Sequence, residues 1–246
     1  MEMSGLWGGL YRICEWIYRF TITNLLWFVC SIPFLFIILM SINAMSLEDL
    51  GPFYSSLILL AIAAPFTVFP ANGGLFSVVR KWNMGEEDVP IVKTFFRGYK
   101  SNYLQSVMGG ILFVLLLGLF VINYQFYSAM DNAMQLLSIV FLFLIAVLGV
   151  AVYYYTCLMV HVHMKTLTLL KNAFFLTIGR PLTSLMIALI NFIGIYFSVF
   201  IYQVLIMLVT ASFLGYATFY LFYRMFSKIQ EQAEKAKEEE LETANQ

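Results

Sequence analysis

Long apolar stretches alternate along the chain with shorter segments that carry its charges. Crossing the hydrocarbon core of a bilayer, about 30 Å thick, takes about 20 helical residues. Stretches of this kind occupy residues 22–42, 53–79, 104–122 and 136–160. Between Pro181 and Arg224 there is no charged residue, which leaves room for two more spans, 182–202 and 204–224, with a turn near Tyr202 and Gln203.

This pattern predicts a polytopic, all-α membrane protein with six transmembrane helices arranged as three hairpins. We expect residues 1–226 to form a single membrane domain and residues 227–246 a charged cytoplasmic tail. In that tail Glu231 and Lys235 have the i, i+4 spacing of a solvated helix. The composition agrees, because 61% of the residues are hydrophobic and 11% charged, against roughly 45–50% and about 25% in soluble domains.

Several classes of site are disfavoured by the same composition. The formal net charge is zero, and no nucleic-acid motif occurs, so we expect no nucleic-acid partner. Cys14, Cys30 and Cys157 stand singly, which predicts neither a disulfide framework nor a metal site. No small-residue cleavage pattern follows the first apolar stretch, so we expect that span to be retained.

Positive charges occur on alternate connectors only. Short cytoplasmic loops retain Lys and Arg, whereas translocated loops lack them. The connectors 43–52 and 123–135 contain no cation; all fourteen cations lie within residues 12–19, 80–100, 165–180 and 224–237. Both termini are therefore predicted to be cytoplasmic, which requires an even number of spans.

Each hairpin is preceded by a segment with an amphipathic pattern. In residues 5–20, Arg12, Glu15 and Arg19 share one helical face, and in residues 90–103 the cations Lys93 and Arg97 do so together with Lys100. Residues 164–181 form the third such segment. We expect cytoplasmic amphipathic helices that lie in the headgroup layer of the membrane.

Within the predicted spans we find no ionisable residue of the kind that marks proton relays, ion paths or catalysis in membranes. We therefore expect no enzyme activity and no cofactor. Neutral polar residues favour interhelical hydrogen bonds, with a substrate site as the alternative; they are Asn24, Thr67, Asn72, Asn191, Gln203, Thr210 and Ser212. His161 and His163 have i, i+2 spacing, which points them apart on a helix and favours a structural role over metal binding.

The second span contains an unusual run of helix-disturbing residues. Pro65 and Pro70 each remove a backbone donor, so the helix should bend or break near both. Gly73 and Gly74 permit another backbone to approach closely, and Asn72 lies between the two pairs. Two interpretations remain open: a kink that packs the hairpins together, or a broken helix that lines a small-molecule path.

The cytoplasmic end of this span begins a basic and aromatic segment. Arg80 and Lys81 are followed by Trp82, whose indole suits the membrane interface. We interpret these residues, together with the cations of the next segment, as a candidate docking surface: Arg80, Lys81, Trp82, Lys93, Arg97 and Lys100.

The same region resembles the core signature of the YesL family, bacterial membrane proteins built around a domain of unknown function. The similarity extends over residues 1–223 and departs from the usual family pattern at Asn72-Gly73. The residues that carry it are Glu15-Trp16, Asn24-Leu-Leu-Trp27, Phe69-Pro-Ala71, Gly74-Leu-Phe76, Val78-Val-Arg-Lys-Trp82, Gly85-Glu86, Asp88, Pro90-Ile91, Lys93-Thr-Phe95, Tyr99-Lys100, Lys171-Asn-Ala-Phe174 and Arg180-Pro181.

The resemblance implies a multi-pass protein of the bacterial cytoplasmic membrane. Members have no established biochemical activity, and many are encoded beside carbohydrate ABC-type uptake systems and polysaccharide-degrading enzymes. We therefore expect a non-enzymatic accessory or assembly partner of a carbohydrate ABC-type uptake system. The alternative is a small-molecule transporter or permease subunit with its path at the broken second helix.

Overall fold

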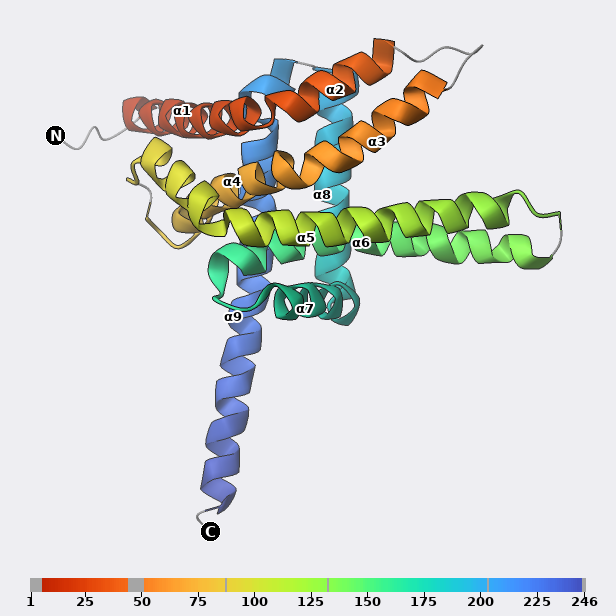
Figure 1. The fold of residues 1–246 in the computed structure, drawn as a ribbon. Helices are drawn as coiled ribbons and strands as arrows, with labels where there is room; N and C mark the ends of the chain where they lie inside the picture. Colours follow the sequence, from red (N-terminus) through yellow and green to blue (C-terminus); the bar gives the residue numbers. More distant parts are fainter. Residues whose placement is uncertain (1–5, 44–50, 87, 132, 203, 245–246) are drawn as a thin grey trace.

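The computed structural model describes the chain except for residues 1–5, 44–50, 87, 132, 203 and 245–246, and the described residues form helices joined by short connections (Figure 1). In chain order the elements are α1 (Leu6–Cys30), α2 (Ile32–Asn43), α3 (Gly51–Phe66), α4 (Val68–Asn83), α5 (Ile91–Ser128), the 3₁₀ turn η1 (Ala133–Gln135), α6 (Leu136–His161), α7 (Thr166–Gly179), α8 (Pro181–Phe200), the π-helical segment η2 (Ile206–Thr210) and α9 (Ala211–Ala244).

The helices of the described residues have the length and composition that membrane spans need. Four of them are long and apolar enough to cross a bilayer, and the number rises to as many as six if each of two bent pairs counts as one span. The prediction of an all-α protein with apolar, membrane-length helices is confirmed to this extent.

The first predicted span, residues 22–42, is not one continuous helix. α1 and α2 meet at Ser31 with a bend of 72°. Pro33 lies in the first turn of α2, where its missing N–H leaves no helical bond unmade, but its ring prevents α1 from continuing through this point. The helix predicted for residues 5–20 is also not separate, because α1 runs from Leu6 to Cys30 without interruption.

The second predicted span is broken once, between its two prolines. α3 and α4 meet at Thr67 with a bend of 40°. Pro65 lies in the last turn of α3, and Pro70 is the third residue of α4, where no intrahelical acceptor would be available to a backbone N–H anyway. The sequence predicted a bend or break near each proline, and the structure has one break, at Thr67, between them.

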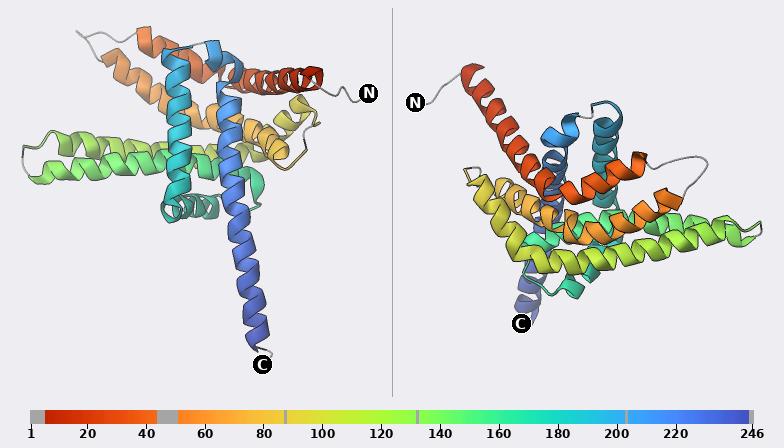
Figure 2. Two further views of the ribbon diagram at one scale, coloured as in Figure 1. Left: turned by 180° about the vertical axis from the view of Figure 1, so that it is seen from behind. Right: turned by 45° about the horizontal axis from the view of Figure 1, so that its top comes forward.

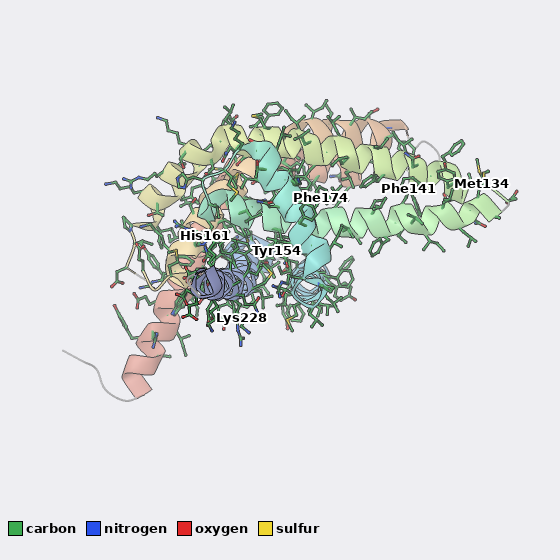
Figure 3. The ribbon with its side chains drawn as sticks, turned by 90° about the horizontal axis from the view of Figure 1, so that it is seen from below. Met134, Phe141, Tyr154, His161, Phe174 and Lys228 are labelled. Atoms are coloured by element: carbon green, nitrogen blue, oxygen red, sulfur yellow. The ribbon has the colours of Figure 1, made fainter. Side chains whose placement is uncertain are left out.

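α5 and α6 pack along each other as a long antiparallel pair that projects beyond the other helices (Figures 1 and 2). Figure 3 shows Met134 and Phe141 in this projecting part, far from the labelled residues of the core. Leu115 is 65% exposed and Phe143 likewise 65%, so apolar side chains face outward here. The separate amphipathic helix predicted for residues 90–103 is wrong, since this segment is the first part of α5.

α8 and α9 form another packed pair, which crosses the α5 and α6 pair steeply instead of running parallel to it (Figures 1 and 2). Tyr202 lies in the connection between α8 and η2, and Gln203 lies outside the described residues. α7 is a separate helix between α6 and α8. α9 continues into the charged tail as one helix that extends away from the rest of the molecule.

α4 is the most enclosed helix of the fold. It packs against α1, α3, α5, α6 and α9. Its buried residues include both small and large apolar side chains: Pro70, Ala71, Gly73, Gly74, Leu75, Phe76, Val78, Val79 and Trp82. The segment with the unusual sequence is therefore the packing centre of the protein.

Candidate functional site

The glycines of α4 and α5 bring these two helices into close contact. A Cβ atom on Gly74 would lie 3.0 Å from the ring of Phe95, and one on Gly110 would lie 2.9 Å from Cα of Pro65. A Cβ on Gly73 would lie 3.1 Å from Oγ of Ser106. The break between α3 and α4 is thus seated against the glycines of α5, which supports the packing interpretation of the kink.

Asn72, which lies between the prolines and glycines, faces a different neighbour, α1. Its Oδ1 accepts a hydrogen bond of 2.7 Å from the indole N–H of Trp27 on α1. Asn72 also lines a cavity of about 300 Å³ between α4, α6, α8 and α9. On the opposite wall, Oδ1 of Asn191 is buried without a hydrogen-bond partner in the described residues. The alternative interpretation, a small-molecule site beside the broken helix, therefore has a cavity to occupy.

Asn24 of α1 holds the junction between η2 and α9. Its Nδ2 donates to the carbonyl oxygens of Ile206 (2.9 Å) and Met207 (2.7 Å), and its Oδ1 accepts from the backbone N–H groups of Ala211 (2.8 Å) and Ser212 (3.2 Å). A π-helical turn leaves backbone groups without their usual partners. One side chain satisfies four of them.

The predicted interhelical hydrogen bonds are confirmed for most of the neutral polar residues. Asn24 and Asn72 make the bonds given above, Asn191 donates to Oγ1 of Thr218 on α9, Ser212 donates to the carbonyl of Phe20, and Thr210 bonds to Ser198. Thr67 is the exception, because its hydroxyl donates to Ala63 of its own helix. Gln203 lies outside the described residues.

The candidate docking surface loses one of its predicted members. Trp82 is only 3% exposed and packs edge-on against Trp16 and Phe20 of α1. The prediction that it anchors the protein at the membrane interface is wrong, because Trp82 lies on the same face of α4 as the buried Leu75 and Val78. Its position on that face was the signal that sequence analysis overlooked.

The other members of this surface separate into two groups. Lys93, Arg97 and Lys100 are exposed along the first part of α5; we call these three residues the α5 ridge. Arg80 and Lys81 at the end of α4 are half-buried, and Lys81 forms an ion pair of 2.8 Å with Glu86.

Arg80 and Lys81 line a cleft of about 670 Å³ together with Arg97, and we call this feature the basic cleft. Its walls come from the end of α4, the first part of α5 and the connection between α6 and α7. The lining residues are Ser77, Arg80, Lys81, Thr94, Arg97, Gly98, Ser101, Asn102, Gln105, Met159, Val160, Val162, His163, Met164 and Lys165. Sequence analysis did not connect Lys165 with Arg80, because 84 positions separate them in the chain and no local pattern relates them.

The two histidines point into different surroundings, as their spacing predicts. His161 packs edge-on against four aromatic rings of α9, at centroid distances of 5.3–6.0 Å, and its Nδ1 accepts a hydrogen bond of 3.4 Å from Nε of Arg80. Figure 3 shows His161 and Tyr154 on the side of α6 that meets α9. His163 instead lines the basic cleft. Among the described residues, no group of three metal-ligating side chains occurs.

Arg19 differs most from its predicted environment. We expected it on a solvated face of an interfacial helix, but its side chain is 7% exposed and bonds to Glu15 (2.6 Å) and Asp88 (3.0 Å). Its guanidinium also lies 5.3 Å from the ring of Trp16. Burial of a charge requires such partners, so Arg19 ties α1 to the connection between α4 and α5.

The helices and their polar contacts are typical of one class of protein. The apolar helices, outward-facing apolar side chains and hydrogen-bonded interior polar groups are those of a membrane-embedded helical protein. Residues 20–124, which run from α1 to the projecting part of α5, match the family described as "Protein of unknown function, DUF624".

Relatives from Bacillus subtilis (strain 168) extend this match. YesL is 23% identical over 230 residues, which cover 94% of this chain and 95% of YesL. YteU is 34% identical over 113 residues (46% of this chain, 38% of YteU), and YesV is 31% identical over 116 residues (47% of this chain, 56% of YesV). This chain thus matches well under two thirds of YteU and YesV, and all three relatives are described as uncharacterized proteins.

Together, the domain match and the similarity along nearly all of YesL support membership of the chain in the YesL/DUF624 family. No solved structure matches the chain.

Proposed function

We propose that the protein is a non-enzymatic integral membrane protein that assists another membrane complex and docks to it through the α5 ridge. The observation that carries this proposal is the exposure of Lys93, Arg97 and Lys100 on one continuous helix whose remaining length carries no charge. None of the three forms an ion pair with a described carboxylate. Exposed cations of this kind favour association with a partner of opposite charge.

The proposed arrangement in the bacterial cytoplasmic membrane places the ridge and both termini in the cytoplasm, with the α2/α3 and α5/α6 pairs as the hairpins that cross the bilayer. The beginning of α1 and the end of α9 lie at the left and bottom of Figure 1, whereas the free ends of the α2/α3 and α5/α6 pairs lie toward the right. The connectors 43–52 and 123–135 near those free ends carry no cation. The positive-inside rule supports this orientation.

The resemblance to the YesL family suggests the partner, a carbohydrate uptake system of the ABC type. The test replaces Lys93, Arg97 and Lys100 with Glu and measures which proteins co-purify after cross-linking in native membranes, together with uptake of labelled oligosaccharide. A matched control makes the same charge change in the exposed tail at Lys228, Lys235 and Lys237.

We expect the ridge variant to lose the co-purifying transporter subunits and the tail variant to keep them. Because all six side chains are exposed, neither variant is expected to unfold. Unchanged co-purification and uptake in the ridge variant would reject the proposed docking.

The cavity beside Asn72 favours a second candidate, a small-molecule transporter or permease subunit. The cavity is lined mainly by aliphatic and aromatic side chains, with Asn72 and Asn191 among the polar ones, and Oδ1 of Asn191 has no hydrogen-bond partner in the described residues. Vesicles reconstituted with this protein alone should then accumulate labelled oligosaccharide without an ATPase subunit. Asn191→Leu should abolish that accumulation, whereas vesicles that never accumulate the label would eliminate this candidate.

A further inference from the structure

We infer that the basic cleft binds the phosphate group of a ligand. This inference goes beyond the proposed docking, because it depends on Arg80 and Lys165, which do not belong to the α5 ridge. Three segments that are distant in the sequence contribute to the cleft: the end of α4, the first part of α5 and the connection that precedes α7.

The charge in the cleft is of one sign. Arg80, Lys81, Arg97 and Lys165 line it, and none of its lining residues is an aspartate or glutamate. Lys81 is paired with Glu86, whereas the other three cations form no ion pair with a described carboxylate. Gathering like charges raises the free energy of the folded state, and a bound anion would lower it again.

Hydrogen bonds within its walls give the cleft a fixed shape. Gln105 donates a hydrogen bond of 2.8 Å to the carbonyl of Met164, which ties α5 to the residue next to Lys165. Ser77 donates to the carbonyl of Gly73 (2.7 Å), and Asn102 donates to the carbonyl of Gly98 (2.9 Å) and to the hydroxyl of Ser77 (3.5 Å). The volume of about 670 Å³ is in the usual range of small-molecule sites, about 300–1,000 Å³.

Phosphate is the anion that these groups suit best. Arg side chains bind phosphate through two parallel N–H bonds, and Arg80 and Arg97 both reach the cleft. Nε of Arg80 is directed to His161, which orients the guanidinium and leaves its terminal nitrogens available. Lys165 directly precedes α7, so the positive end of that helix dipole also lies beside the cleft.

Two sources can supply such a phosphate: the headgroup of an anionic phospholipid or a soluble phosphorylated compound. Apolar side chains at the end of α6, Met159 and Val160, line the same cleft. They can contact either an acyl chain or the apolar part of a metabolite. The experiment therefore has one arm for each source.

The full-length protein is reconstituted in nanodiscs of phosphatidylcholine. In the first arm phosphatidylglycerol is titrated in, and bound lipid is counted by native mass spectrometry. In the second arm inorganic phosphate and glycerol 3-phosphate are titrated by calorimetry. The test variant is Arg80→Gln/Lys165→Gln; the matched control, Lys93→Gln/Lys100→Gln, removes the same charge outside the cleft. If the double variant does not fold, Lys165→Gln alone replaces it as the test variant, because the side chain of Lys165 is exposed.

We expect the test variant to bind at least about tenfold more weakly in one of the arms, since a charge-assisted hydrogen bond contributes roughly 1.5–3 kcal/mol. The affinity of the control variant should stay within about twofold of that of the unchanged protein. Binding of phosphatidylglycerol alone identifies a lipid site, and binding of either soluble phosphate identifies a metabolite site. Equal losses in both variants, or no binding in either arm, would overturn the inference.

The outcome is separable from that of the proposed docking. The docking test changes Lys93, Arg97 and Lys100, whereas this test changes Arg80 and Lys165. Because Arg97 also lines the cleft, the two proposals are separated with Lys93→Gln/Lys100→Gln, which changes the ridge and leaves the lining of the cleft intact. If that variant binds phosphate normally but no longer co-purifies with a partner, this inference stands independently of the docking.

Discussion

Trp27 donates its indole N–H to Oδ1 of Asn72 across 2.7 Å, joining α1 to the broken, buried helix α4. Both residues lie beside the cavity between α4 and α9. The hydrogen bond therefore fixes the first helix against the most enclosed helix of the fold. That relationship gives Asn72 a structural role whether or not the cavity binds a ligand.

A double-mutant cycle on this pair should reveal coupling. Trp27→Phe and Asn72→Ala each remove one partner, and the double variant should lose less stability than the sum of the two. Interhelical hydrogen bonds in membranes contribute about 0.6–1.7 kcal/mol. The measurement is thermal unfolding in detergent, followed by reaction of the buried thiol of Cys157 with a maleimide dye, with Cys14 and Cys30 replaced by Ser. Additive effects would show that the two side chains do not interact.

Asn24→Ala should destabilise the protein more than any other single amide substitution. The change leaves four backbone groups around η2 without their partner, and each buried unpaired group costs about 1–3 kcal/mol. Asn123→Ala is the control, because within the described part of the chain the hydrogen bond of Asn123 is to Leu119 of its own helix. The same thiol-reaction assay should give a clearly lower unfolding temperature for Asn24→Ala alone; equal temperatures would refute the role of Asn24.

Gly109→Ala and Gly118→Ala form a matched pair on α5. A Cβ at Gly109 would clash with the ring of Tyr155, whereas a Cβ at Gly118 meets no atom within 4 Å. Tyr155 cannot easily move aside, because it is fully buried and its hydroxyl donates to the carbonyl of Gln105 at 2.7 Å. Gly109→Ala should therefore cost about 1–3 kcal/mol, and Gly118→Ala should change stability by no more than about 1 kcal/mol. A reversal of this order would contradict the described packing of α5 on α6.

The length and composition of the apolar stretches were enough to predict an all-helical membrane protein. Backbone N–H and C=O groups in lipid must be hydrogen-bonded within the protein, and a helix achieves this within a single segment. The sequence also indicated which polar residues would bond between helices. Asn191 and Ser212 do so because an amide or hydroxyl in an apolar environment requires a partner. The identity of that partner, Thr218 for one and Phe20 for the other, depends on tertiary packing and has no local signal.

Residues predicted to lie at the membrane interface were harder to place. Arg19 and Trp82 have the residue types of an interface, yet both are buried, and both contact Trp16. Arg19 tolerates burial because Glu15 and Asp88 pair with it, and Asp88 comes from a connection 69 residues away. The break at Ser31 was within reach of sequence analysis, since Pro33 lies only two residues after it.

Cysteine labelling tests the orientation of the chain. In a variant without Cys14, Cys30 and Cys157, single cysteines are introduced at Ser128, the last residue of α5, or at Gln232, which is exposed in the tail. The connector after Ser128 contains no cation up to residue 135, whereas the tail contains several. By the positive-inside rule, a membrane-impermeant maleimide should label Ser128→Cys in intact cells, but label Gln232→Cys only after permeabilisation. Labelling of the tail in intact cells would mean that the chain crosses the membrane an odd number of times or runs in the opposite direction.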